Sequence, residues 1–220
     1  MGGIFAIYKP KGMTSHDVVE KIRRVTGERS VGHAGTLDPL AEGVLVVGVG
    51  TSTKYLDKIV AKEKEYFVRI KLGEESTTDD ADGEKRVVFA KEIPRSDKIA
   101  ELLEKFKGKI MQVPPLYSAV KVEGEESYKW MRRGEPKELK AREVEVKDIE
   151  VISYDWPNLS LKLVTGPGFY VRSLARDIGR ELKTGGYVQE LFRTRVGEYT
   201  NKEAIRLENF AEFWKARELS

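Results

Sequence analysis

The chain has 220 residues, enough for one large domain or two small ones, and 40% of them are hydrophobic. A chain of this length buries roughly 70% of its unfolded surface, so it forms a core without disulfides or metals. Its 39 basic and 36 acidic residues leave a net charge of only +3, so the total charge does not identify a polyanionic partner.

Several kinds of site and location are excluded by residue usage. Cysteine is absent, which removes disulfides, thiolate metal sites and cysteine nucleophiles. Two histidines, His16 and His33, are too few for a zinc site built from histidine. The longest apolar run, Val44 to Val49, is far shorter than the roughly 18 residues that a membrane span requires. We therefore expect a cytoplasmic protein that uses no metal and no membrane.

The beginning of the chain predicts a strand followed by a capped helix. Residues 4–8 are mostly apolar and favour a strand. Thr14 and Asp17 have the spacing of a helix capping box, and Gly27 is the expected end of that helix. Between the strand and the helix, residues 9–12 read Lys-Pro-Lys-Gly, which predicts an exposed basic turn.

The next segments alternate between loops and regular elements. Residues 32–42 predict a loop, and Val44 to Val49 predict a strand buried on both faces. We expect a helix over 52–60 and a half-buried strand over 64–72, where apolar residues alternate with polar ones. Residues 74–84 contain six acids and no base, which predicts a solvated turn.

The second half of the chain continues the mixed pattern. We expect a helix capped by Ser96 and closed by Gly108, strands over 144–151 and 159–163, and helices over 171–182 and 207–219. Residues 123–140 predict an inserted, solvated loop and helix. No repeat or linker appears, so we expect a single α+β domain over 1–220.

Three arginines lie on one side of the predicted helix over 171–182. Arg172, Arg176 and Arg180 are spaced at i, i+4 and i+8, opposite the apolar face. The spacing alone indicates a solvated basic face, with Arg176 and Arg180 as surface or phosphate contacts.

The most informative segment is residues 32–43, which read Gly-His-Ala-Gly-Thr-Leu-Asp-Pro-Leu-Ala-Glu-Gly. Its glycines let a backbone approach a ligand, and the buried strand behind the loop would hold Asp38 in place. Asp before Pro also starts many ordinary turns. The spacing alone leaves both interpretations open: a presented carboxylate or a turn cap.

This segment resembles the active-site signature of the TruB family of tRNA pseudouridine synthases, and further stretches resemble the family in the same order along nearly the whole chain. These stretches are Lys9 to Ser15, Lys64-Glu65-Tyr66, Leu72-Gly73, Gln112 to Pro115, Tyr117 to Ala119 with Lys121, Gly168 to Leu174, and Leu191 to Gly197. The resemblance implies the pseudouridine synthase fold, a central mixed and mostly antiparallel sheet flanked by helices and loops.

The resemblance also implies a reaction and roles for residues. The reaction is isomerisation of the T-loop uridine at position 55 of tRNA, without a cofactor. Asp38 matches the catalytic aspartate, and Arg172 matches the arginine that pairs with it. Tyr66 matches the tyrosine that stacks on the flipped base. The positions implied to bind the substrate with Tyr66 are His33, Tyr170 and Leu191.

Two features concern how RNA is held. Family members usually carry a C-terminal RNA-binding PUA domain, and we expect that domain to be missing here. RNA binding would then depend on the catalytic domain and on the inserted segment around 121–142. That insertion favours a stand-alone enzyme, expected to be monomeric, that binds the T arm of tRNA without a guide RNA.

Two other functions stay open. One is a non-catalytic RNA-binding module or tRNA-folding chaperone that keeps the fold. The other is an N-glycoside hydrolase that uses Asp38 on a free nucleoside. Intact Asp38, Tyr66 and Arg172 argue against the first.

Overall fold

We describe residues 2–219 of a computed structural model of the chain. They divide into two compact units, one of Met1–Phe67 with Leu191–Ser220 and one of Val68–Glu190. The boundaries fall inside two strands, β4 (Lys64–Leu72) and β12 (Gly186–Val196), rather than in linkers. The expectation that the whole chain forms one catalytic domain stays a prediction.

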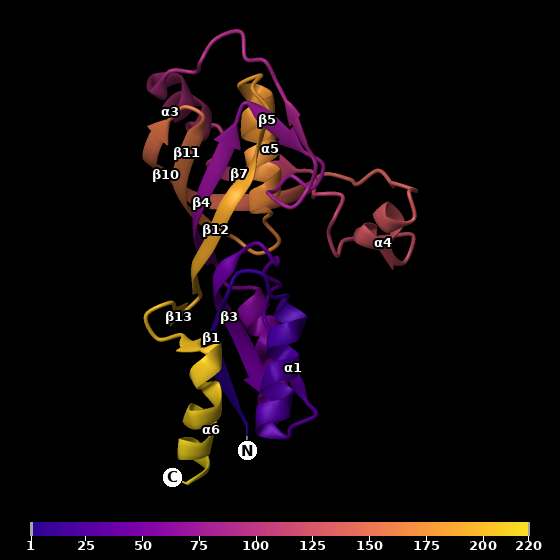
Figure 1. The fold of residues 1–220 in the computed structure, drawn as a ribbon, viewed down its shortest axis with the longest axis vertical. Coiled ribbons are helices and arrows are strands. Elements are labelled where there is room, and N and C mark those ends of the chain that lie inside the picture. Colours follow the sequence, from indigo (N-terminus) through magenta and orange to yellow (C-terminus); the bar gives the residue numbers. More distant parts are fainter. Residues whose placement is uncertain (1, 220) are drawn as a thin grey trace. The chain divides into compact units, whose positions relative to one another are not determined.

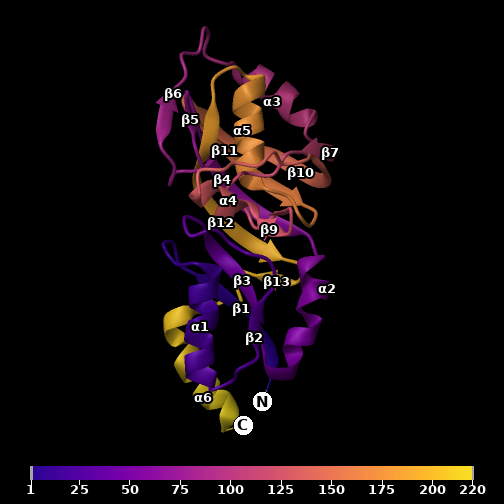
Figure 2. The same cartoon turned by 90° about the vertical axis from the view of Figure 1, so that its right-hand side faces the viewer.

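The first unit contains part of a mixed sheet, with strand order β14-β1-β3-β12. Its elements are β1 (Gly3–Lys9), α1 (Ser15–Thr26), β2 (Val31–His33), β3 (Glu42–Val49), the 3-10 helix η1 (Gly50–Tyr55), α2 (Leu56–Val60), β13 (Tyr199–Thr200), β14 (Ile205–Arg206), the 3-10 helix η2 (Leu207–Asn209) and α6 (Phe210–Glu218). Figure 2 shows α1 and α6 on one face of these strands and α2 on the other.

Local sequence signals explain much of this unit. The capping box of Thr14 and Asp17 starts α1, and Gly27 ends it in a left-handed conformation at φ 67°. Strand β3 is buried from Gly43 to Val49, as its unbroken apolar run predicts. The helix expected over 52–60 is instead η1 followed by α2. The Thr53 hydroxyl donates to the Gly50 carbonyl, and such local bonds compete with α-helix formation.

The second unit contains the strand order β12-β4-β11-β10-β7. Its other elements are β5 (Glu74–Ser76), β6 (Lys85–Val87), α3 (Ser96–Glu104), β7 (Gly108–Gln112), β8 (Lys121–Val122), β9 (Glu125–Glu126), α4 (Ser127–Arg132), β10 (Arg142–Asp155), β11 (Asn158–Thr165) and α5 (Val171–Glu181). Figure 1 shows the segment with α4 projecting to the side of this unit's strands. That this segment is an insertion stays a prediction.

Most strand pairs are antiparallel, whereas β1 with β14 and β3 with β12 are parallel, so the predicted mixed sheet is confirmed. The predicted Ser96 cap is wrong, because the extended residue before α3 is Arg95, which has no side-chain capping bond. The Arg95 guanidinium instead makes an exposed ion pair with the Asp97 carboxylate over 2.7 Å.

Candidate active site

Asp38 lies in the loop of the first unit between β2 and β3, and the backbone on both sides of it is tied down. The Leu37 N–H donates to the Ser15 hydroxyl oxygen over 2.8 Å, and that hydroxyl donates to the Leu37 carbonyl over 3.0 Å. The Pro39 carbonyl accepts a 2.7 Å bond from the Gly12 N–H. The half-buried Asp38 is therefore presented from a fixed loop.

Arg193 on β12 anchors the same loop from the interior of the first unit. Its side chain is 1% exposed. The guanidinium donates to the carbonyls of Val44 over 2.8 Å, Gly35 over 3.0 Å and Thr36 over 3.3 Å. No role was predicted for Arg193, although an arginine in a strand with buried apolar neighbours was an available signal.

A buried lysine, Lys9, lies beside this loop. Its ammonium donates to the Met13 carbonyl over 2.6 Å and to the Pro10 carbonyl over 3.0 Å. Burial lowers the pKa of Lys9 to about 8, although the Asp38 carboxylate acts in the opposite direction. The prediction of an exposed basic turn over 9–12 is therefore wrong for Lys9. Its ammonium is buried and donates to backbone carbonyls instead of to water.

A second buried lysine, Lys64, begins β4. Its ammonium donates to the carbonyls of Val60 over 2.6 Å and Lys62 over 2.7 Å. Burial, assisted by the positive charge of Arg193, lowers the pKa of Lys64 to about 8. Lys9, Lys64 and Arg193 together give the first unit a positive interior near the loop that carries Asp38.

Tyr66 on β4 is buried in the same unit. Burial raises the pKa of its phenol, the guanidinium of Arg193 opposes that shift, and the Asp38 carboxylate adds to it. These electrostatic interactions indicate that Tyr66, Arg193 and Asp38 lie near one another. The phenol stays neutral at physiological pH, and the stacking role predicted for its ring stays a prediction.

The other two predicted residues of the first unit flank this group. Leu191 is buried on β12, two residues before Arg193 and so on the same face of the strand. His33 is half-buried at the end of β2, and burial is the main cause that lowers the pKa of its imidazole. Its Nδ1 is buried and has no hydrogen-bond partner among the described residues. A neutral imidazole at His33 is suited to stacking rather than to an ionic contact.

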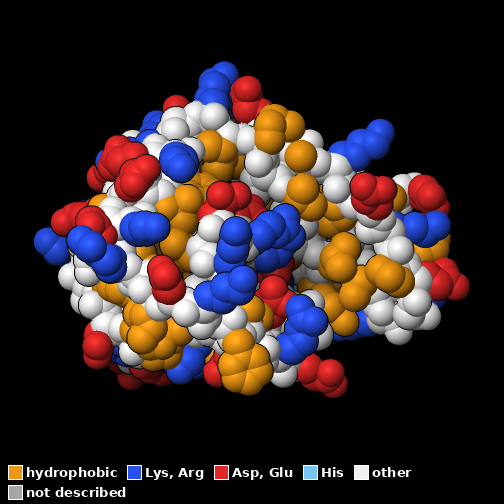
Figure 3. All heavy atoms as spheres, turned by 90° about the horizontal axis from the view of Figure 1, so that it is seen from above, with side chains coloured by type: hydrophobic (Ala, Val, Ile, Leu, Met, Phe, Trp, Pro, Cys, Tyr) orange, Lys and Arg blue, Asp and Glu red, His pale blue; other side chains and the backbone are white. Residues whose placement is uncertain are grey.

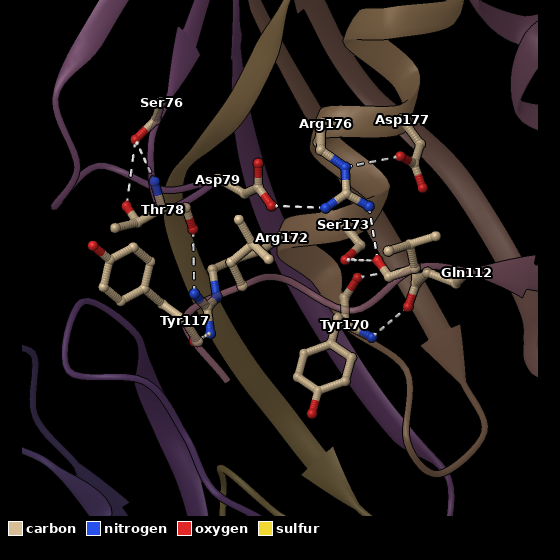
Figure 4. Close-up of polar contacts among 12 residues, drawn as sticks. Ser76, Thr78, Asp79, Gln112, Tyr117, Tyr170, Arg172, Ser173, Arg176 and Asp177 are labelled. Carbon is tan, nitrogen blue, oxygen red and sulfur yellow. Dashed lines mark hydrogen bonds and ion pairs between the residues drawn. The ribbon is translucent and has the colours of Figure 1, made fainter. Parts of the chain in front are cut away.

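Arg172 belongs to the second unit, near the beginning of α5, and is buried with 6% exposure. Its guanidinium donates to the carbonyls of Tyr117 over 3.0 Å and Thr78 over 3.2 Å, as Figure 4 shows. The Asp80 carboxylate lies 3.5 Å from the same guanidinium. The solvated basic face that the arginine spacing predicts is therefore wrong for Arg172, because residues 78–80 cover it.

Asp80 was missed because its acidic neighbours indicate a solvated turn. Residues 74–76 instead form β5, which pairs with β6 (Lys85–Val87) in a short hairpin, and Asp80 in the connecting loop is 4% exposed. Asp80 accepts bonds from the Thr78 hydroxyl and from the Asp82 N–H. The expectation of a fully solvated turn over 74–84 is wrong at this position.

Tyr170 precedes α5 in the second unit, and its backbone is held by one side chain. The Tyr170 N–H donates to the Gln112 side-chain oxygen over 2.9 Å, and the Gln112 amide nitrogen donates to the Tyr170 carbonyl over 3.1 Å. The ring itself is half-buried. Gln112 begins the Gln-Val-Pro-Pro stretch that carries part of the family resemblance. Its side chain fixes the backbone of the residue that precedes α5.

The predicted residues thus form two groups. His33, Asp38, Tyr66 and Leu191 belong to the first unit, and Tyr170 and Arg172 belong to the second. The pairing of Asp38 with Arg172 stays a prediction.

Comparison with known proteins identifies the class. The chain superposes on a Cbf5-Nop10-Gar1 complex with a TM-score of 0.76 at 30% identity, covering 99% of this chain and 57% of that one. An H/ACA RNP bound to a substrate RNA containing 2′-deoxyuridine gives a TM-score of 0.72 at 26% identity, covering 99% and 56%. The mixed sheet flanked by helices is the fold of the pseudouridine synthases.

Family models give the narrower assignment. Residues 23–171 match the N-terminal domain of the TruB family pseudouridylate synthases, and residues 172–219 match the tRNA pseudouridylate synthase B C-terminal domain. The chain belongs to the TruB family. It is 46% identical to tRNA pseudouridine synthase B of Thermobifida fusca, covering 95% of this chain and 74% of that protein, and 38% identical to that of Clostridium tetani, covering 96% and 73%.

Two kinds of feature are absent from the described residues, a membrane-spanning helix and a cluster of metal ligands. No helix within residues 2–219 is long and apolar enough to cross a membrane. Within the same residues, no group of three or more His, Cys, Asp or Glu side chains could hold a metal ion.

Proposed function

We propose that this pseudouridine synthase converts the T-loop uridine at position 55 of tRNA to pseudouridine, with Asp38 as its catalytic carboxylate. The names of its relatives support tRNA as the substrate class. The observation that carries the proposal is the fixed loop of Asp38, whose flanking residues are bound by Ser15, Gly12 and Arg193. A carboxylate held this way needs little reorganisation when a nucleotide arrives.

The reaction is an isomerisation. The bond between N1 and C1′ breaks, the uracil rotates, and a bond forms between C5 and C1′. C5 loses a proton and N1 gains one, so the atoms balance without a co-reactant. Asp38 starts the reaction either by attacking C1′ or by removing a proton from the ribose to give a glycal, and the proposal includes both routes.

Flipping the uridine costs stacking energy, which an aromatic surface must replace. Tyr66 would stack on the flipped uracil, with Tyr170 and Leu191 lining the pocket, and His33 would fill the space that the base leaves in the RNA loop. The neutral state of Tyr66 supports this role, since a phenolate would repel the nearby carboxylate. Arg172 would pair with Asp38 and keep it ionised.

The inserted segment over 121–142 would bind RNA. In α4, the ring of Trp130 has the Arg133 guanidinium 4.3 Å and the Lys137 ammonium 4.6 Å from its centroid. Cations beside an aromatic ring are typical of surfaces that bind nucleic-acid strands. Lys and Arg side chains also gather in the middle of the face drawn in Figure 3, beside acidic ones. Phosphate contacts of this kind would make affinity fall steeply with salt.

Tritium release tests the proposal. A T-arm transcript with 5-tritiated uridine at position 55 should release tritium with the full chain. RNA binding without release would favour the chaperone. Chromatography of the digested product separates the remaining alternative, because a hydrolase liberates free uracil whereas an isomerase retains the base in the RNA.

A further inference from the structure

Arg176 lies one turn after Arg172 on α5 and makes three contacts that the arginine spacing did not predict. Its guanidinium donates to the Val113 carbonyl over 2.7 Å, to the Asp79 carboxylate over 2.9 Å and to the Asp177 carboxylate over 3.0 Å. Its side chain is 21% exposed. Three of the five N–H donors of this guanidinium are therefore engaged within the protein, which a role as a surface or phosphate contact does not require.

Two of the three partners of Arg176, Asp79 and Val113, belong to the same two segments that hold Arg172, whereas Asp177 lies on α5 itself (Figure 4). Asp79 stands between Thr78, whose carbonyl accepts from Arg172, and Asp80, whose carboxylate lies beside it. Val113 begins the stretch that leads to Tyr117, whose carbonyl also accepts from Arg172. The Ser173 hydroxyl adds a second bond to the Val113 carbonyl over 2.8 Å.

The Asp79 backbone is bonded to Ser76 and Val188, and Arg176 holds its side chain. Its backbone has a φ of 61°, which is unusual for a residue other than glycine and costs about 1 kcal/mol. Burial raises the pKa of its carboxyl, and Arg176 is the first of the charges that oppose this shift, followed by Arg172. Removing Arg176 would leave a half-buried carboxylate without its 2.9 Å partner, so the Asp79 side chain and the carbonyl of Thr78 beside it would be held less tightly.

We propose that Arg176 is a positioning residue for Arg172 in pseudouridine formation. It clamps residues 78–80 and the start of residues 113–117, and so holds the two carbonyls that orient the Arg172 guanidinium. This inference rests on the proposed catalytic role of Arg172. Arg176 itself does not need to touch the RNA.

The test measures single-turnover tritium release at saturating enzyme, and RNA affinity separately, with the full chain and the T-arm transcript. Arg176→Ala should lower the rate constant by at least about tenfold while the RNA dissociation constant changes by less than about twofold. Asp79→Asn, which tolerates the left-handed backbone, should lower the rate constant in the same direction. Arg176→Lys should recover part of the rate but not all, because one ammonium cannot reproduce the guanidinium fork. Arg95→Ala is the matched control, since it removes an exposed Arg–Asp pair of the same unit.

A double-mutant cycle separates a role of Arg176 that acts through Arg172 from an independent role of Arg176. In an Arg172→Lys background the oriented guanidinium is already gone, so adding Arg176→Ala should cost less than about threefold. Fully additive effects would overturn the positioning role. A raised, salt-dependent dissociation constant with an unchanged rate constant would also overturn it and would make Arg176 a phosphate contact. Full activity of Arg172→Ala would instead overturn the proposed role of Arg172, and the inference with it.

Discussion

Gly43 on β3 approaches Arg193 on β12 so closely that a Cβ on Gly43 would lie 2.3 Å from the Arg193 carbonyl oxygen. The φ of Gly43 is 109°, a conformation that side chains rarely adopt. On its other side, Gly43 pairs with Lys9 of β1. The missing side chain at Gly43 thus lets β1 and β12 pack closely against β3. These two strands carry the buried cations Lys9 and Arg193.

Gly43→Ala should therefore be strongly destabilising. We expect the free energy of unfolding to fall by about 3 kcal/mol or more, because both the clash and the backbone strain act against the folded state. Urea unfolding measures it. Gly124→Ala is the matched control, since Gly124 has a φ of 85° and open space around its missing side chain. Equal losses in the two variants would show that strain alone matters and that the close approach does not.

Asp38→Asn should fold and bind the T-arm transcript with no detectable turnover. The substitution preserves shape and removes the charge that starts the reaction, while the backbone of the flanking loop is held by the side chains of Ser15 and Arg193. Tritium release and RNA binding give the two measurements. Substantial residual turnover would assign the chemistry to another group.

Arg193→Lys should weaken both stability and catalysis. A single ammonium cannot reach the carbonyls of Val44, Gly35 and Thr36 together, so buried acceptors lose their donors. We expect a loss of about 3 kcal/mol in the free energy of unfolding and a slower single-turnover rate at temperatures where the variant is folded. Arg195→Lys, on the same strand, keeps the ion pair with Glu63 and should change neither quantity appreciably. A stable Arg193→Lys variant with the normal rate would show that the loop does not need this anchor.

Lys64 should make stability depend on pH. Its pKa is about 8 in the folded chain against 10.5 for an ordinary lysine. Below pH 8 both states are protonated. Above it the folded protein releases a proton that the unfolded chain keeps until about pH 10.5, so the free energy of unfolding rises with pH across this window.

Lys64→Met removes this contribution. As the pH is raised from about 7 to about 9.5, the free energy of unfolding of this variant should therefore fall relative to that of the unchanged protein. Urea unfolding at the two pH values measures the change in that difference. Lys62→Met is the control, because Lys62 is exposed. A difference that does not vary with pH would show that Lys64 keeps an ordinary pKa.

Local patterns predicted the fold better than they predicted burial. The capping box of α1, its closing glycine and the alternation of β4 depend on neighbouring residues, and the structure confirms them. The burial of Lys9 depends on carbonyls that fold back onto its amine, which no periodicity reveals. The same holds for Arg172, whose spacing indicates solvent until residues 78–80 fold over it.

The candidate site divides in the same way. Asp38, Tyr66 and Arg172 were found through motifs that follow the family in order along the chain. Arg193 and Asp80 escaped because each acts through tertiary contacts: one bonds to carbonyls some 150 residues earlier in the chain, and the other is hidden among acidic neighbours. The role of Arg176 depends on the contacts of a neighbouring arginine and could not be predicted before those contacts were known.

The side-chain amide of Gln112 bonds to both backbone groups of Tyr170: it accepts from the N–H and donates to the carbonyl. The main chain at Tyr170 is therefore fixed just before α5 begins. If this residue lines the uracil pocket, the backbone sets the position of that wall, and enlarging the pocket would require a smaller residue at position 170 rather than a looser segment.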